Sequence, residues 1–158
     1  MTLDRATLIT LAAAGSAAVL AGAFAFQHIG GLAPCKLCIW QRWPYAFAVV
    51  LGLIGMAAPR AAIAYAGAAA ALTTSAIGLY HTGVERKWWE GPSTCTGGNS
   101  EDLSAMTGSE LLSLDGGTAI VMCDEVAWSL MGLSMASWNA LIGLGLAALW
   151  IAAARRPA

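Results

Sequence analysis

Four long stretches of this chain contain no charged residue, and this feature limits its possible folds more than any other. They cover residues 6–35, 43–59, 61–84 and 126–154. A helix of roughly 20 apolar residues, with about 17 to 25 as the working range, crosses the hydrocarbon core of a bilayer. Each stretch is long enough for one crossing, so the sequence predicts four transmembrane helices.

The composition favours a membrane protein over a soluble or a disordered one. Of the 158 residues, 58% are hydrophobic and 11% are charged, whereas a soluble domain carries roughly 25% charged residues. Disordered chains combine low hydrophobicity with high net charge, but the formal net charge here is −1. This balance also argues against a nucleic acid partner, because phosphate binding requires a clustered excess of Lys and Arg.

The predicted fold class is all-α, an integral membrane four-helix bundle that forms one domain over residues 1–158. Helix-breaking residues and charges place the spans at about 6–28, 39–58, 61–81 and 137–154. Two segments, at about 29–38 and 82–136, then lie on the same side of the bilayer. The second is acidic, and we expect short helices in it after Ser100 and Ser109, where acidic residues follow a capping residue.

The first span could instead be a secretory signal peptide. Arg5 precedes it, and Ala23-Phe24-Ala25 resembles a cleavage site. However, the apolar region of a signal peptide is only about 7 to 15 residues long, so we favour a retained span. Three further spans remain in either case.

All four cysteines fall in the two segments on one side of the predicted membrane. Cys35 and Cys38 form a Cys-x-x-Cys before the second span, while Cys95 and Cys123 lie in the acidic segment. Lys and Arg are equally numerous on the two sides, so the positive-inside rule does not orient the chain. Because disulfides persist in oxidising compartments, we expect the cysteine side outside and both termini in the cytoplasm. Four cysteines allow three pairings.

The Cys-x-x-Cys lies where a helix is expected to begin. Backbone N–H groups and the helix dipole favour an anion there, so a thiolate should form more easily than at a free cysteine. Arg42 follows Cys38 by one helical turn on the same face. An arginine so close to lipid suggests function, although it could also be an interfacial anchor.

The cysteines also permit a structural interpretation. A disulfide between Cys95 and Cys123 would close a loop of 27 residues and stabilise the fold by roughly 3 to 4 kcal/mol. Four thiolates could alternatively bind zinc, but the second pair lacks the close spacing usual in zinc sites. We therefore expect no metal ion, and a non-enzymatic scaffold remains an alternative.

These residues resemble a known family, disulfide bond formation protein B, the quinone-linked membrane thiol oxidase of bacteria. The resemblance covers nearly the whole chain. It rests on Phe26-Gln27-His28, Pro34-Cys35-Lys36-Leu37-Cys38-Ile39-Trp40-Gln41-Arg42, Tyr80-His81, Cys95, Cys123-Asp124-Glu125, Trp128 and Gly132.

The resemblance implies a protein-dithiol:quinone oxidoreductase in the bacterial cytoplasmic (inner) membrane. Its partner would be a periplasmic, DsbA-like thiol oxidase with a thioredoxin-like fold, which would form a mixed disulfide with Cys95. The freed Cys123 would attack the pair of Cys35 and Cys38. Cys38 would then pass two electrons to a bound quinone, ubiquinone or menaquinone, with Arg42 stabilising the anions formed. A reductive relay in the opposite direction is the alternative.

The resemblance also suggests that His81 lies near the quinone head group. The alternative is a boundary histidine bonded to water or to a carbonyl group, since His adapts readily to such sites. His28 lies at the end of the first span and has no evident chemical neighbour in the sequence.

Overall fold

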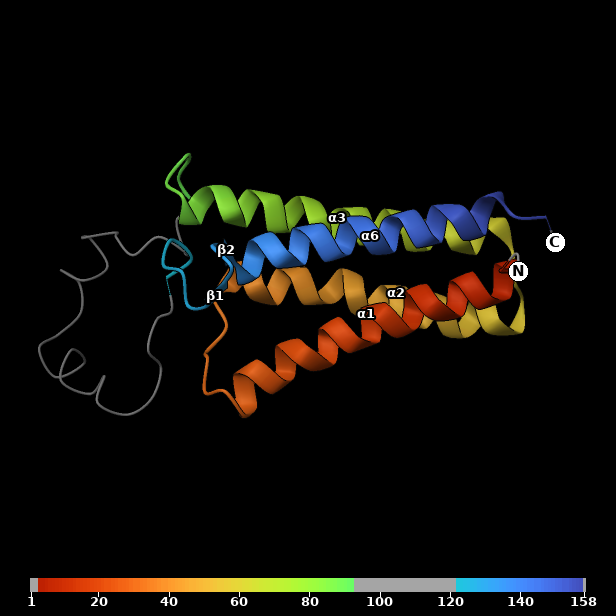
Figure 1. The fold of residues 1–158 in the computed structure, drawn as a ribbon, viewed down its shortest axis with the longest axis horizontal. Coiled ribbons are helices and arrows are strands. Elements are labelled where there is room, and N and C mark those ends of the chain that lie inside the picture. Colours follow the sequence, from red (N-terminus) through yellow and green to blue (C-terminus); the bar gives the residue numbers. More distant parts are fainter. Residues whose placement is uncertain (1–2, 93–121, 158) are drawn as a thin grey trace, which may run out of the picture.

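The computed structural model describes residues 3–92 and 122–157 and consists mainly of four long helices (Figure 1). They are α1 (Arg5–His28), α2 (Lys36–Ala57), α3 (Ala61–Glu85) and α6 (Met135–Arg155). Within the described residues, these four helices are long and apolar enough to cross a membrane. The chain is therefore an all-α, multi-pass membrane protein, as predicted.

Three helices are longer than the hydropathy pattern predicts at the end that carries the cysteines. α2 begins at Lys36 instead of residue 39, α3 continues to Glu85 instead of ending at residue 81, and α6 begins at Met135 instead of residue 137. Polar residues can continue a helix beyond the hydrocarbon core, so hydropathy underestimates its length. The short helices expected after Ser100 and Ser109 lie outside the described residues.

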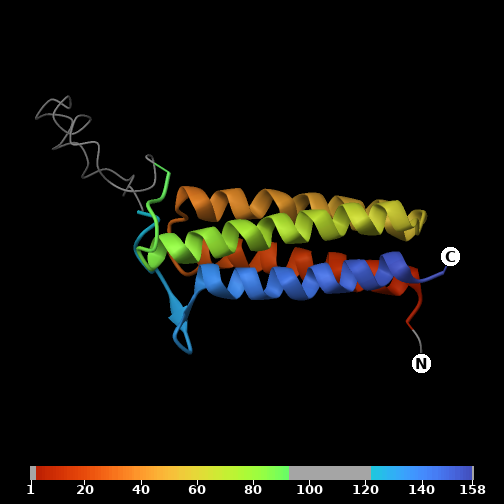
Figure 2. The ribbon, with the colours of Figure 1, turned by 90° about the horizontal axis from the view of Figure 1, so that it is seen from above.

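The four helices form a ring in the order α1, α2, α3 and α6, and α6 closes against α1. Both chain termini and the short α2–α3 connection lie at one end of the bundle (Figure 1; Figure 2). At that end the Arg5 guanidinium donates hydrogen bonds to the backbone carbonyls of Pro59, Ala153 and Arg156. One side chain therefore connects α1 to the α2–α3 connection and to the C-terminal end of α6.

Small residues allow the helices to pack closely. A Cβ atom on Gly67 of α3 would overlap the ring of Trp150, which is fully buried on α6. The outward faces instead carry exposed apolar side chains such as Phe47 and Leu53. This distribution suits lipid as the surrounding solvent, because association of membrane helices depends on close packing rather than on hiding apolar surface.

A short β-hairpin precedes α6. Its strands are β1 (Ser129–Leu130) and β2 (Leu133–Ser134), paired antiparallel. Met131 and Gly132 form the turn, with φ values of 52° and 78°, as a two-residue type I′ turn requires. The hydropathy pattern assigns these residues to the segment at about 82–136 and does not predict the strands. Ser134 then caps α6 by accepting a hydrogen bond from the Ser137 backbone N–H.

Candidate redox site

Cys35 is the N-cap of α2, and its sulfur takes the place of the oxygen that usually caps a helix. Sγ accepts a hydrogen bond from the backbone N–H of Cys38 over 3.2 Å. N–H groups in the first turn of a helix have no partner within the helix, so a side-chain acceptor satisfies one of them. The Cys-x-x-Cys therefore does open a helix.

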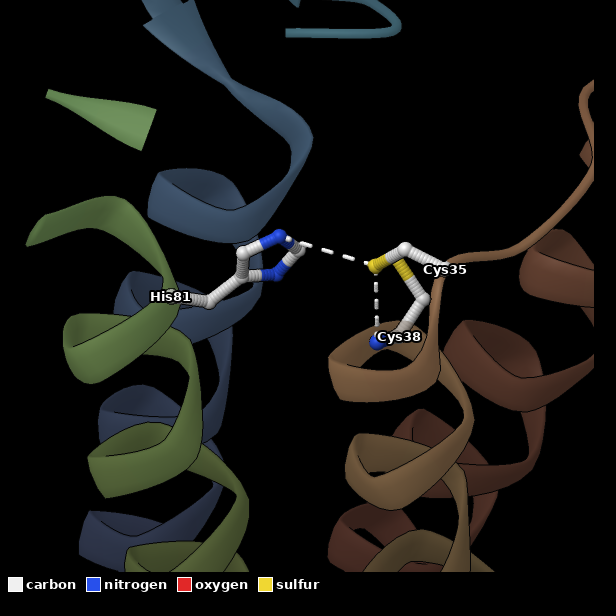
Figure 3. A group of neighbouring side chains, drawn as sticks. All are labelled: Cys35, Cys38 and His81. Atoms are coloured by element: carbon white, nitrogen blue, oxygen red, sulfur yellow. Dashed lines mark hydrogen bonds between the residues drawn. The ribbon is translucent and has the colours of Figure 1, made fainter. Parts of the chain in front are cut away.

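The sulfur atoms of Cys35 and Cys38 are 2.7 Å apart (Figure 3). A disulfide requires about 2.05 Å, so the sulfurs need to move by less than about 1 Å when the dithiol loses two electrons and two protons to become the disulfide. The hydrogen bond of the Cys35 thiol to Cys38 and the burial of Cys35 raise the pKa of Cys35 well above its ordinary value. In the reduced pair, Cys35 therefore keeps its proton.

Arg42 lies one turn beyond Cys38 and reaches across to α1. Its Nη1 donates to the Gln27 side-chain oxygen over 2.6 Å, and its Nη2 donates to the Ala23 carbonyl over 3.4 Å. The guanidinium also stacks over Phe24 at 4.9 Å from the ring centroid. Its Nε is buried and has no hydrogen-bond partner among the described residues, which leaves one donor for a ligand.

His81 of α3 is buried and points toward the cysteine pair (Figure 3). Its Nε2 lies 3.6 Å from Cys35 Sγ and 3.9 Å from a carboxylate oxygen of Glu85. Its Nδ1 lies 3.1 Å from the side-chain nitrogen of Gln41. The structure thus brings His81 to Cys35, although the two residues are 46 positions apart in the sequence.

Two amide residues that the sequence analysis does not select belong to the same buried network. The Asn139 side-chain nitrogen of α6 lies 2.6 Å from the side-chain oxygen of Gln41, and Gln41 contacts His81. Gln41 immediately precedes Arg42, and Asn139 is an amide inside a predicted span. A polar residue within a span is itself a functional signal, and that signal could have identified Asn139.

A cavity of about 430 Å³ opens beside this network, within the usual range for small-molecule sites. Its walls are largely apolar and come from α1, α2, α6 and the residues before α6. Cys38, Arg42 and His81 also line it. A flat apolar ligand with hydrogen-bond acceptors would suit such a cavity, because the unpartnered Nε of Arg42 could donate to it.

Cys123 comes from the segment between α3 and α6 and reaches the same end of the bundle. It is fully buried and packs with Cys35, Leu37 and Val84, while Cys38 lies at the margin of this cluster. The described part of the chain therefore brings three of the four predicted site cysteines together, and all three are free thiols. Cys95 lies outside the described residues.

Two further aromatic contacts lie near the ends of α1 and α3. His28 is exposed and stacks on Phe24. Trp89 stacks on Tyr80 and donates to its backbone carbonyl. Such exposed aromatic residues at a helix end are typical of anchors at the membrane interface.

A family model and several relatives of known name match most of this chain. The family model described as disulfide bond formation protein DsbB matches residues 5–153. Disulfide bond formation protein B 2 of Pseudomonas aeruginosa is 32% identical over 147 residues, which cover 87% of this chain and 83% of the relative.

Two other relatives are each named disulfide bond formation protein B. That of Dechloromonas aromatica is 34% identical over 138 residues, covering 85% of this chain and 82% of the relative. That of Methylococcus capsulatus is 36% identical over 138 residues, covering 84% and 83%. No solved structure matches significantly.

Proposed function

The chain belongs to the disulfide bond formation protein B family, and we propose that it reoxidises a periplasmic dithiol protein and passes the electrons to a membrane quinone. Family membership makes it a disulfide-forming oxidoreductase of the membrane. The observation that carries it is the position of Cys38, which lies in the cysteine pair and also lines the apolar cavity.

The residues around the cavity fit a quinone. The largely apolar walls suit its ring and tail, and the buried, unpartnered Nε of Arg42 offers a donor for a carbonyl oxygen. A bound quinone would accept an electron pair and two protons. The protein would supply position and electrostatics, which is its usual share in cofactor chemistry. Arg42 would hold the head group, and His81 would lie beside it in the cavity wall.

The proposed relay moves one electron pair through successive disulfide exchanges. A partner thiolate attacks Cys95, a mixed disulfide between the partner and Cys95 forms, the Cys95–Cys123 bond breaks, and Cys123 leaves with the electron pair. Cys123 then attacks Cys35, a Cys123–Cys35 bond forms, and the bond between Cys35 and Cys38 breaks. The pair thus resides on Cys38 Sγ. The packing of Cys123 against Cys35 supports this order, because attack on Cys35 leaves the charge on Cys38, the less buried of the two cysteines that line the cavity.

Arg42 would stabilise the negative charge that this exchange leaves on Cys38. It follows Cys38 by four residues on the same helix, and residues with this spacing lie on one helical face. Its hydrogen bonds to α1 hold the guanidinium at the cavity. A fixed positive group stabilises a thiolate more strongly in a site of low polarity than the same group would in water, where the solvent screens the two charges.

We propose that the whole chain acts as one membrane domain in the bacterial inner membrane. The cysteine-bearing end would face the periplasm, and the end with both termini would face the cytoplasm. The reason is chemical, since disulfides persist in an oxidising compartment. A soluble, thioredoxin-like dithiol oxidase could reach Cys95 and Cys123 only on that side.

A metal site is the competing function, because Cys35, Cys38 and His81 bring two sulfurs and a nitrogen within 4.8 Å of one another. Two thiolates on a tetrahedral zinc ion, each about 2.3 Å from the metal, lie about 3.8 Å apart. The observed separation of the sulfurs is 2.7 Å. This shorter distance favours the disulfide chemistry.

The test uses the purified full chain in a lipid nanodisc, with ubiquinone or menaquinone and a reduced thioredoxin-like dithiol protein. We expect loss of protein thiols with matching reduction of quinone, and we expect Cys38→Ser to abolish both. Failure to consume thiols with either quinone would refute the proposal. Production of thiols from reduced quinone and an oxidised partner would instead establish the reductive relay.

A further inference from the structure

A buried chain of hydrogen bonds runs from α6 through α2 to α3 and ends at the cysteine pair. Asn139 contacts Gln41, Gln41 contacts Nδ1 of His81, and Nε2 of His81 faces Cys35 Sγ. Thr74 of α3 anchors the far end through contacts with Asn139. Such a chain has a direction, because each amide presents a donor on one side and an acceptor on the other.

Thr74 determines this direction. The Asn139 side-chain nitrogen faces the Thr74 backbone carbonyl at 3.4 Å, and a carbonyl can only accept. The Thr74 hydroxyl donates to the Gln41 backbone carbonyl over 3.0 Å, so at 3.3 Å it accepts from the same Asn139 nitrogen. The NH₂ group of Asn139 therefore points toward Thr74 and Gln41.

The orientation of Asn139 determines the next two groups in turn. The Gln41 atom that faces Asn139 at 2.6 Å must be its oxygen, so its NH₂ group faces His81. Nδ1 of His81, at 3.1 Å, must then accept. A neutral imidazole carries one proton, and here that proton must be on Nε2.

The surroundings of Nε2 agree with a donor at this position. Cys35 Sγ lies 3.6 Å away and a Glu85 carboxylate oxygen lies 3.9 Å away. A sulfur whose own proton points to Cys38 and a carboxylate are both acceptors, so each of these neighbours favours an Nε2–H group.

We infer that Gln41 and Asn139 are positioning residues that hold His81 as a neutral Nε2–H donor, which stabilises negative charge on Cys35 Sγ instead of removing its proton. Nδ1 is occupied by the Gln41 donor, so the ring has no free lone pair to act as a base. The backbone N–H of Cys38 is the second donor to the same sulfur. Two donors converge on Cys35 from different helices.

The role of His81 in stabilising charge on Cys35 during turnover rests on the proposed function. The Nε2–H tautomer of His81 follows from the hydrogen bonds alone. After Cys123 attacks Cys35, the second thiolate of the partner attacks the partner sulfur of the mixed disulfide, which oxidises the partner and releases the Cys95 thiolate. This thiolate then attacks Cys123. The Cys95–Cys123 bond then forms, the Cys123–Cys35 bond breaks, and the electron pair remains on Cys35 Sγ. No proton is transferred and no further oxidant is needed. A hydrogen bond from Nε2–H strengthens as charge develops on the leaving sulfur.

The tautomer can be read directly from the ¹⁵N resonances of histidine in the full chain. The protein has only two histidines, and exposed His28 serves as an internal reference. At mildly alkaline pH, we expect the protonated nitrogen of His81 to be Nε2. A proton on Nδ1 in the unaltered protein would overturn the inference without the need for any variant.

Gln41→Glu should reverse the hydrogen bond to His81, because a carboxylate accepts from both neighbours. The proton of His81 should then move to Nδ1. Gln27→Glu is the matched control, since Gln27 and Gln41 are the two glutamines of the chain and Gln27 contacts Arg42 instead. A tautomer that stays the same in Gln41→Glu, or that changes equally in Gln27→Glu, would contradict the positioning role.

The effect of His81 on the reactivity of Cys35 is measured in a Cys38→Ser background, in which Cys35 has no neighbouring thiol at residue 38. There we expect His81→Phe to slow alkylation of Cys35 by about tenfold or more at a fixed pH, as loss of a hydrogen bond to a charged group implies. His28→Phe should leave this rate unchanged. An unchanged rate in His81→Phe would refute the stabilising role of His81.

These measurements distinguish the inference from the proposed function. If the tautomer and the alkylation rates follow the expectation but the unaltered protein oxidises no dithiol with quinone, the proposed function is wrong and the positioning network stands. If turnover occurs but His81 carries its proton on Nδ1, the network is wrong and the proposed function stands.

Discussion

Arg42 of α2 and Gln27 of α1 are joined directly, with Arg42 Nη1 donating to the Gln27 side-chain oxygen over 2.6 Å. The contact crosses between two helices that border the cavity. Gln27 is polar and near the end of an apolar helix, and its acceptor holds the guanidinium while leaving Nε without a partner among the described residues. The hydrogen bond therefore fixes the guanidinium in a position that leaves its Nε–H group available to a ligand.

Arg42→Ala should raise the KM for quinone by roughly tenfold or more, since a hydrogen bond to a charged group contributes about 1.5 to 3 kcal/mol. Gln27→Leu should produce a smaller increase, because it frees the guanidinium without removing it. Steady-state kinetics with varied quinone concentration measures both. Arg60→Ala, at the opposite end of the bundle, is the control, and an unchanged KM in Arg42→Ala would make Arg42 a structural anchor.

Cys123→Ser should separate the two halves of the relay. The variant should no longer oxidise a protein dithiol, because the buried sulfur that reaches Cys35 is missing. A small dithiol that attacks the pair of Cys35 and Cys38 directly should still be oxidised with quinone. Rates with both reductants are compared with those of Cys38→Ser, which should be inactive with either. Full activity of Cys123→Ser with the protein dithiol would exclude Cys123 from the relay.

The pH dependence of Cys35 follows from its raised pKa. The hydrogen bond to Cys38 and burial favour the neutral thiol, so at any pH the thiolate fraction is lower than at a free cysteine, whose pKa is about 8.5. In the reduced chain, alkylation at residue 35 should therefore begin to rise only at a higher pH than in a denatured control. Mass spectrometry of the labelled peptides gives the profile.

Replacement of Cys38 should lower the raised pKa of Cys35. Because the hydrogen bond to Cys38 is the largest cause of the raised pKa, the Cys35 alkylation profile in Cys38→Ser should move to lower pH. An equal or higher midpoint in that variant would show that burial alone sets the acidity of Cys35.

Gly67→Ala should lower the free energy of unfolding by about 1 to 3 kcal/mol, the usual cost of overpacking a core. The added Cβ atom would meet the fully buried ring of Trp150. Gly145→Ala is the matched control, because nothing lies within 4 Å of a Cβ atom there. Equilibrium unfolding in mixed micelles compares the two. Equal stabilities would mean that the α3–α6 contact can relax around the methyl group.

The proposed topology predicts opposite labelling at the two ends of the bundle. Ile29→Cys, at a position with 88% exposure near the cysteine end, should react with membrane-impermeant reagents in intact cells. Arg60→Cys, in the short connection between α2 and α3, should react only after the membrane is permeabilised. Mass spectrometry distinguishes each new cysteine from the native ones. Ready labelling of Arg60→Cys from outside would reverse the topology.

The sequence by itself predicted the four membrane helices and the closeness of Cys35, Cys38 and Arg42 at the start of the second one. Both depend on interactions that are local in the chain. Hydrophobic length determines whether a helix can cross a bilayer, and residues three or four positions apart share one helical face. Cys35, Cys38 and Arg42 lie within two turns of one another. Only their proximity was predictable in this way, and their roles remain part of the proposed function.

The tertiary structure alone decided which residues from other helices reach the start of α2, where Cys35, Cys38 and Arg42 lie. His81 faces Cys35, Gln27 holds Arg42, and Asn139 contacts Gln41. Each contact depends on how a helix is rotated about its axis. These helices are apolar on all sides, so their hydrophobic pattern does not indicate which face points inward. Close packing of small residues and a few polar pairs determines the rotation, and both arise only when the helices meet.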